Sequence, residues 1–174
     1  EGGIVSVTAL MTDSKGNLWI GTNSGRVVLY QGEEFHSLAV TSGEKIDSIR
    51  CFEEMEDGTI YVGTTGKMCK IGSDNTLQVL EADVNYVISM TQYEGWLVGC
   101  TNQGDLFVME EDNVVQVYLN ENPEAYYTCV GVANERIMAG TSLDEIEELC
   151  IIDNRIWVAD RWNIAPLFGI QEIT

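Results

Sequence analysis

One short motif recurs along this chain at regular intervals, and it limits the folds that the chain can adopt. The stretch Asp13–Thr22 reads DSKGNLWIGT. Weaker copies end in glycines roughly 40 residues apart, and the series of glycines is Gly21, Gly63, Gly99 and Gly140. A fifth copy, RIWVAD at Arg155–Asp160, has alanine in the glycine position. Repeats of this length, made of short runs rich in aromatic and β-branched residues, indicate a β-propeller with about 40–45 residues in each four-stranded blade.

Each full period divides into four strand-like segments. In the first period these are IVSVTALM, LWIGT, RVVLY and FHSLAV. We therefore expect an all-β fold, a β-propeller that is a partial or small ring of four-stranded antiparallel blades. The chain is expected to form one propeller domain over 1–174, with approximate blades at 4–43, 46–82, 85–122, 125–142 (truncated) and 146–174.

The truncated fourth blade breaks the rhythm of the repeat. After Thr141, about 20 residues that would form the third and fourth strands of this blade are not found before the next first strand, expected at Ile146. Three explanations stay open from the sequence. The blade is truncated, a stretch is missing from the sequence, or Ser142 and Glu145 form the capping box of a short helix.

The motif itself has a structural explanation. Asp13–Gly16 suits a tight connection between two strands, because Asp accepts hydrogen bonds from turn amides and Gly tolerates the left-handed conformation. Gly21 lacks a Cβ atom and lets a neighbouring sheet approach closely. We interpret the motif as a turn and a buried strand, and not as a group of catalytic residues.

Charge and cysteine content exclude several classes of protein. The chain has 9 Lys and Arg residues and 28 Asp and Glu residues, which give a formal net charge of −19. A surface with this charge repels phosphate backbones, so nucleic acid is not expected as a partner. The five cysteines have no zinc-site or disulfide-framework spacing and are expected to be mostly buried free thiols. No run of 18 apolar residues is present, and the first residues lack the pattern of a signal peptide.

The motif resembles the two-component regulator propeller repeat, D-x-x-G-N-[LI]-W-[IV]-G-T followed by a glycine. DSKGNLWIGTNSG at Asp13–Gly25 is similar over its whole length, and EDGTIYVGTTG at Glu56–Gly66 has Tyr61 in place of the tryptophan. The resemblance implies a sensor region of a bacterial signal-transduction protein, located in the periplasm or at the cell surface. It also implies a downstream signalling module in the full-length protein, and some members of the family bind oligosaccharides.

No catalytic constellation is apparent, so we expect neither an enzyme nor a cofactor or metal. The one histidine, His36, falls on the expected outermost strand of the first blade. No nucleophile elbow, zinc-protease motif or phosphate-binding loop is found.

Binding is expected at one rim of the propeller, where the connections between second and third strands meet those between blades. Tyrosine and tryptophan side chains there could stack on sugars, and amides and basic groups could hydrogen-bond a small polar ligand or carbohydrate. Basic residues in these loops favour an anionic or polar ligand. A protein–protein interaction scaffold is the alternative, and a second copy of the chain could complete the ring. The candidate ligand-binding residues are Asn23, Arg26, Lys67, Tyr86, Asn102, Gln103, Tyr126, Tyr127, Arg161, Trp162 and Asn163.

Overall fold

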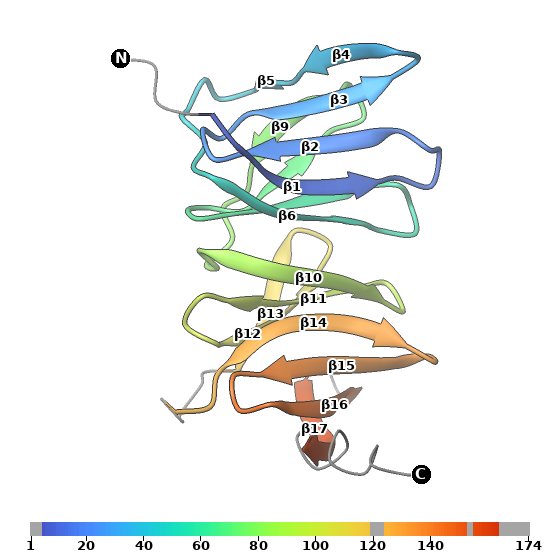
Figure 1. Ribbon diagram of the computed structural model, residues 1–174, viewed down its shortest axis with the longest axis vertical. Coiled ribbons are helices and arrows are strands. Elements are labelled where there is room, and N and C mark those ends of the chain that lie inside the picture. Colours follow the sequence, from blue (N-terminus) through green and yellow to red (C-terminus); the bar gives the residue numbers. More distant parts are fainter. Residues whose placement is uncertain (1–4, 119–123, 153–154, 164–174) are drawn as a thin grey trace, which may run out of the picture.

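The computed structural model describes residues 5–118, 124–152 and 155–163, and in these ranges every regular element is a β-strand. Four sheets follow one another along the chain (Figure 1). The first consists of β1 (Val7–Thr12), β2 (Leu18–Thr22), β3 (Val27–Gln31) and β4 (Glu34–Ser37). The second contains β5 (Ala39–Val40), β6 (Ile49–Glu54), β7 (Ile60–Thr64), β8 (Cys69–Ile71) and β9 (Thr76–Val79).

The third sheet consists of β10 (Val87–Tyr93), β11 (Trp96–Thr101), β12 (Leu106–Glu110) and β13 (Asn113–Tyr118). The fourth consists of β14 (Tyr127–Ala133), β15 (Arg136–Thr141), β16 (Glu145–Ile152) and β17 (Arg155–Asn163). Within each sheet, consecutive strands pair antiparallel, and only the β5–β9 pair is parallel. In the part of the chain that the structure describes, no helical segment could span a bilayer.

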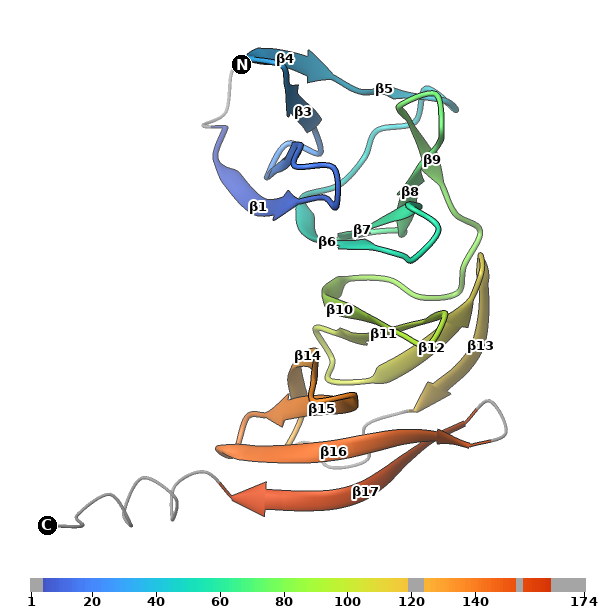
Figure 2. The same cartoon turned by 90° about the vertical axis from the view of Figure 1, so that its right-hand side faces the viewer.

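The four sheets stack side by side as an open arc of propeller blades (Figure 2). Their first strands β1, β6, β10 and β14 contact one another in order, and Figure 1 shows them one above the next. Each junction between neighbouring sheets holds its own apolar core, represented by Ile49, Phe107 and Leu149. The expected all-β propeller of four-stranded blades is confirmed. That a second copy completes the ring stays a prediction.

A repeated threonine explains part of the sequence motif. Its backbone pairs with the first residue of the first strand, just before a register shift that occurs in all four blades. Its hydroxyl accepts a backbone N–H of the following turn, as in Arg26 N to Thr22 Oγ1 at 3.0 Å and Gly66 N to Thr64 Oγ1 at 2.9 Å. Each of these threonines therefore ends a second strand and caps the next turn. The equivalent threonines are Thr22, Thr64, Thr101 and Thr141.

This register corrects the alignment of the third copy. The residue before the threonine is Gly21 in the first blade and Cys100 in the third, whereas Gly99 lies one position earlier. A Cβ atom on Gly21 would lie 2.4 Å from Ile49 Cγ2 of the next blade. The expected close approach at Gly21 is thus confirmed, but in the third blade a buried cysteine occupies the corresponding position.

The structure also corrects the division of the C-terminal part. Glu145–Ile152 pairs with β15, and Arg155–Asn163 pairs with β16, so both are strands of the fourth blade and not the start of a separate blade over 146–174. After Thr141, a short turn in which Asp144 has φ of 57° leads directly into β16, which supplies the third strand of this blade. The helix alternative for this segment was wrong, since Glu145–Ile152 is a strand.

The last segment of the first repeat does not form one continuous strand. The run FHSLAV divides at Leu38, whose N–H donates to Val27 O at 3.0 Å. Ala39 and Val40 then pair with Thr76 and Leu77 of the second sheet. Leu38 and Val40 both pack against the core between the first two blades, and this burial draws the chain across the junction.

Candidate ligand cleft between the first two blades

The two ends of the blades carry different connections. At one end, the turn after each second strand hydrogen-bonds the residue before or at the start of the first strand, as in Asn23 N to Ser6 O and Asn102 N to Tyr86 O, both at 3.0 Å. We call this the Asn23 end, and it is the rim at which binding was expected. The opposite end carries the β1–β2 turn and its counterparts in the other blades, and we call it the Asp13 end.

Most of the candidate residues described with side chains lie at the Asn23 end. Tyr86 and Tyr126 are partly exposed there, and Lys67 Nζ lies 3.3 Å from Glu81 Oε1. The Asn23 side chain accepts the Ser6 N–H at 2.9 Å, so it holds the turn in place. The candidates that come from the turns or strand starts at this end are Asn23, Arg26, Lys67, Tyr86, Asn102, Gln103 and Tyr126.

Tyr127 is not available for stacking on a ligand. It is 7% exposed, and its hydroxyl donates to the buried carboxylate of Glu147. Its ring packs edge-on against Tyr118 at a centroid distance of 6.5 Å. The sequence placed it beside Tyr126, but adjacent residues of a strand point to opposite faces.

The last three candidates lie on β17, where only the backbone is described. Their backbones pair with residues in the first half of β16. Whether they bind a ligand stays a prediction from the sequence. The pairs are Arg161 with Glu147, Trp162 with Ile146 and Asn163 with Glu145.

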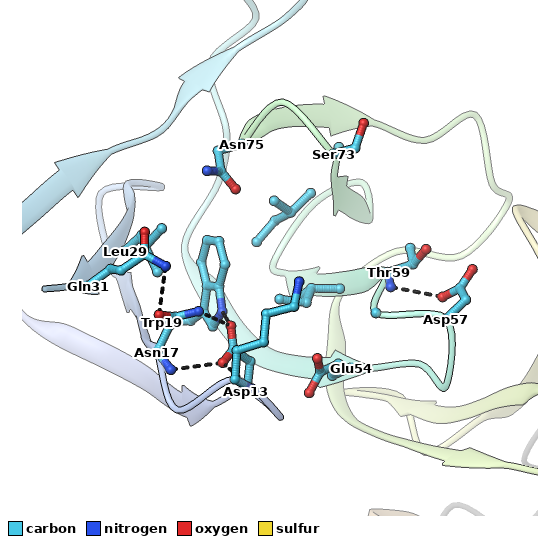
Figure 3. A pocket seen from close by; sticks show the side chains of 15 residues that line it. Asp13, Asn17, Trp19, Leu29, Gln31, Glu54, Asp57, Thr59, Ser73 and Asn75 are labelled. Atoms are coloured by element: carbon cyan, nitrogen blue, oxygen red, sulfur yellow. Dashed lines mark hydrogen bonds between the residues drawn. The ribbon is translucent and has the colours of Figure 1, made fainter.

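A cleft of about 400 Å³ opens at the Asp13 end, between the first and second blades (Figure 3). One wall comes from the β1–β2 turn and β3, and the other from the β6–β7 turn and the β8–β9 turn. Its volume falls in the range of small-molecule sites. Its polar lining consists of Asp13, Lys15, Asn17, Gln31, Glu54, Asp57, Thr59, Ser73 and Asn75, and its apolar lining includes Trp19, Leu29, Ile60 and Ile71.

Asp13 organises the first-blade wall. Its carboxylate accepts the N–H groups of Lys15 at 3.0 Å and Asn17 at 2.8 Å, the Asn17 side-chain amide at 2.9 Å and the Trp19 indole N–H at 3.0 Å. Burial alone would raise the pKa of Asp13, but the hydrogen bonds from Asn17, Trp19 and Lys15 together lower it below 3.8. The motif aspartate thus has the structural role that the sequence indicated.

The second-blade wall is held against the first by Glu54. Its two carboxylate oxygens accept the Ser14 N–H at 2.6 Å and the Ser14 hydroxyl at 2.8 Å, across the junction. Beside it, Asp57 accepts the Thr59 N–H at 2.8 Å, and this bond is the main reason why the pKa of Asp57 is lowered. Glu54 therefore links the two blades directly beside the cleft.

Several polar groups of the cleft are left for a ligand. Among the described residues, the Lys15 ammonium, the Ser73 hydroxyl and the Asn75 side-chain amide make no hydrogen bond or ion pair. Figure 3 shows Ser73 and Asn75 on the wall opposite Asp13. Gln31 uses its amide nitrogen on Asn17 Oδ1 at 2.8 Å, which leaves its oxygen as an acceptor. The cleft can therefore donate and accept several hydrogen bonds above an apolar floor.

Two further cavities are present, one at each end of the blades. One of about 430 Å³ at the Asn23 end is lined by Glu44–Asp47, Lys67 and Val79. Another of about 470 Å³ lies beside the first at the Asp13 end, between the second and third blades. Within the described ranges, no three His, Cys, Asp or Glu side chains are placed to hold a metal ion.

The sequence did not indicate the cleft residues. The β1–β2 turn was interpreted correctly as a structural turn, but its counterpart in the next blade lies beside it and forms the second wall. Turns at equivalent positions of the repeat lie at the same end of a propeller, and this rule could have predicted that the two turns form neighbouring walls. The cleft residues missed in this way are Lys15, Asn17, Gln31, Glu54, Asp57, Thr59, Ser73 and Asn75.

Comparisons with solved structures identify the fold. The extracellular domain of the putative one component system BT4673 from B. thetaiotaomicron superposes with a TM-score of 0.66 at 13% identity, over 91% of this chain and 26% of that one. The extracellular domain of the putative hybrid two component system BT3049 from B. thetaiotaomicron gives a TM-score of 0.68 at 19% identity, over 89% and 23%. A catalytically inactive virginiamycin B lyase from Staphylococcus aureus with quinupristin gives 0.71 at 13% identity, over 88% and 55%.

This chain thus spans about a quarter to about half of the length of these structures. No curated protein matches its sequence. Residues 3–24, which contain most of the first copy of the motif, match the family described as two component regulator propeller. The chain is therefore a β-propeller whose first repeat is similar to the two component regulator propeller family.

Proposed function

We propose that this chain is a non-enzymatic sensory propeller segment of a bacterial signal-transduction protein and that it recognises a small polar ligand. The family match and the likeness to extracellular domains of one- and two-component systems support the sensory role. By the same likeness we propose an extracytoplasmic location, and a downstream module that receives the signal. The observation that carries ligand recognition is the cleft with unengaged polar groups between the first two blades.

The charges of the cleft favour a neutral ligand over an anion. Three carboxylates, those of Asp13, Glu54 and Asp57, line the cleft against the single ammonium of Lys15. An anionic group would approach this surplus of negative charge in a chain with a formal charge of −19. Whereas the anionic or polar ligand was expected at the Asn23 end, we therefore propose for this cleft a neutral polyhydroxylated ligand such as an oligosaccharide. Its hydroxyls would bond Lys15, Ser73 and Asn75.

Signal transfer would depend on the junction between the blades. A ligand that contacts both walls bridges the β1–β2 turn of the first blade and the β8–β9 turn of the second. The Ser14–Glu54 hydrogen bonds already connect these blades at the same place. Ligand binding would favour one spacing of the two blades, and a downstream module would respond to that change.

Thermal-shift and calorimetric titrations with a panel of neutral oligosaccharides test the proposal. Ser73→Trp places a large side chain at an exposed position on the cleft wall and should abolish binding with little loss of stability. Gln103→Trp introduces the same side chain at an exposed turn of the Asn23 end and should leave binding intact. Loss of binding in Gln103→Trp alone would move the site to the rim expected from the sequence.

A full panel without any binding would overturn the ligand-recognition proposal. The protein–protein interaction scaffold would then be the better account of the exposed turns. A matched panel of acidic oligosaccharides tests the charge argument separately, and tighter binding of the acidic series would contradict it.

A further inference from the structure

The Asp13 end carries a second cleft directly beside the first. The β6–β7 turn separates them, and Asp57 and Thr59 line both cavities. This turn is rigidly held, with Met55 N to Thr59 O at 2.8 Å and Gly58 N to Met55 O at 2.9 Å. The two clefts therefore share one wall that is a single short turn.

The second cleft is also built across a blade junction. Tyr61 of the second blade is buried and donates its hydroxyl to Glu111 O at 2.6 Å in the third blade. Lys70 forms an ion pair with Asp112 there. Burial and the nearby Asp112 carboxylate raise the pKa of Tyr61, so this hydroxyl stays a donor. Both junctions thus leave an open, polar cavity at the same end of the arc.

The floors of the two clefts occupy equivalent positions in the repeat. Trp19 pairs with Leu29 on β3, and Tyr61 pairs with Lys70 on β8, and each aromatic side chain is less than 5% exposed. The polar edge of each ring is bonded to a fixed partner, Asp13 for Trp19 and Glu111 for Tyr61. The clefts are consequently successive members of one series, spaced by one blade.

We infer that the two clefts form one extended groove for a linear, neutral oligosaccharide that crosses the β6–β7 turn. This inference rests on the proposed function and adds a requirement for ligand length. A ligand confined to the first cleft contacts the first two blades only. A longer chain passes over Asp57 and Thr59 and also reaches Lys70 and the third blade.

The negative charge of the second cleft supports the same ligand class. Glu56, Asp57, Glu111 and Asp112 line it, with Lys70 as the one basic group. Glu56 is bonded by the Gln92 side chain at 2.9 Å, and Asp112 by Lys70 and Tyr61. Hydroxyl groups can bond the remaining lone pairs of these carboxylates, whereas acidic sugars would meet repulsion in both clefts.

Calorimetric titration with one neutral oligosaccharide series, from two to six sugar units, tests the inference on the intact protein. Affinity should rise by about tenfold or more at the length that first crosses the β6–β7 turn, and should change little beyond the second cleft. Lys70→Met should remove that gain for the longer members while leaving the disaccharide affinity unchanged. Arg136→Met, which removes another ion-paired basic residue on the fourth blade, should leave the whole series unchanged.

The outcomes separate this inference from the proposed function. Binding that is equally tight at every length, and insensitive to Lys70→Met, would overturn the extended groove while the first cleft stands. Binding lost in Ser73→Trp at every length supports the first cleft in either case. Absence of binding at any length is the failure of the proposed function itself. The length series with the unmodified protein remains decisive even if Lys70→Met does not fold.

Discussion

The carboxylate of Asp13 accepts the indole N–H of Trp19 at 3.0 Å, and this bond joins the two ends of the sequence motif. Asp13 is 8% exposed and Trp19 is 4% exposed, so water cannot readily replace either partner. The same carboxylate holds the backbone of Lys15 and Asn17. The motif therefore closes a turn around one buried acceptor.

Asp13→Ala should lower the free energy of unfolding by about 2–4 kcal/mol, because it leaves a buried indole donor and two turn amides without their acceptor. Urea denaturation followed by circular dichroism measures this loss. Asp74→Ala, which removes an exposed turn aspartate bonded to Thr76, is the matched control and should cost less than about 1 kcal/mol. Equal losses in the two variants would contradict the role of Asp13.

The stabilisation by Asp13 should disappear in acid. Its folded-state pKa is lowered from 3.8, so its contribution is fully present above that value and is lost as pH falls below it through the folded pKa. The difference in unfolding free energy between the unmodified chain and Asp13→Asn should be constant near neutral pH and should shrink below about pH 4. Paired urea titrations at several pH values measure it. A difference that grows on acidification would contradict this sign.

Gly21→Ala should destabilise the junction of the first two blades by about 1–3 kcal/mol. The new Cβ would lie 2.4 Å from Ile49 Cγ2 and 2.7 Å from Ile49 Cβ, and Ile49 is fully buried and cannot move aside. Gly131→Ala is the control, because no atom lies within 4 Å of its added Cβ. Thermal and urea unfolding should separate the two variants clearly. A neutral Gly21→Ala would show that the blades do not pack this closely.

The five thiols should differ in reactivity under native conditions. Burial raises the pKa of Cys51, Cys69 and Cys100 to about 12 each, whereas Cys129 is exposed. With Ellman's reagent near pH 8, Cys129 should react first and those three should stay protected until the chain is denatured. Cys129→Ser should remove the fast phase. A fast phase that persists in this variant and maps to Cys69 or Cys100 would contradict the packing of the blade cores.

Local patterns were sufficient to predict four-stranded blades in the first three repeats, apart from Ala39–Val40, which pair with the second sheet. Asp13 and Gly16 form a turn, and the Gly-Thr pairs end strands, through interactions within a few residues. Such interactions can be recognised from the sequence alone. The fourth blade was misread because Glu145–Ile152 and Arg155–Asn163 form a hairpin that looks locally like the first two strands of a new blade. Only the pairing of β15 with β16 shows that the hairpin belongs to the fourth blade and does not start a new one. A local sequence pattern does not indicate which strands pair.

The cleft could not be predicted for a related reason. A cleft forms between two blades where their turns lie far enough apart. Side-chain packing at the junction of the blades sets this distance. Ser14 and Glu54 lie 40 residues apart in the sequence and meet only after the blades have stacked. Tyr127 was expected in a connection at the rim, but it is the first residue of β14, and its hydroxyl donates to Glu147 in the core.

The most direct test of the ligand cleft is a two-dimensional amide NMR titration of the protein with the tightest-binding neutral oligosaccharide. A ligand in this cleft should cause the largest shifts at the Trp19 indole N–H and at the amides of Lys15, Thr59, Ser73 and Asn75, with Asn23, Asn102 and Gln103 unaffected. Shifts confined to the turns of Asn23, Asn102 and Gln103, with the Trp19 indole unmoved, would contradict a site between the first two blades.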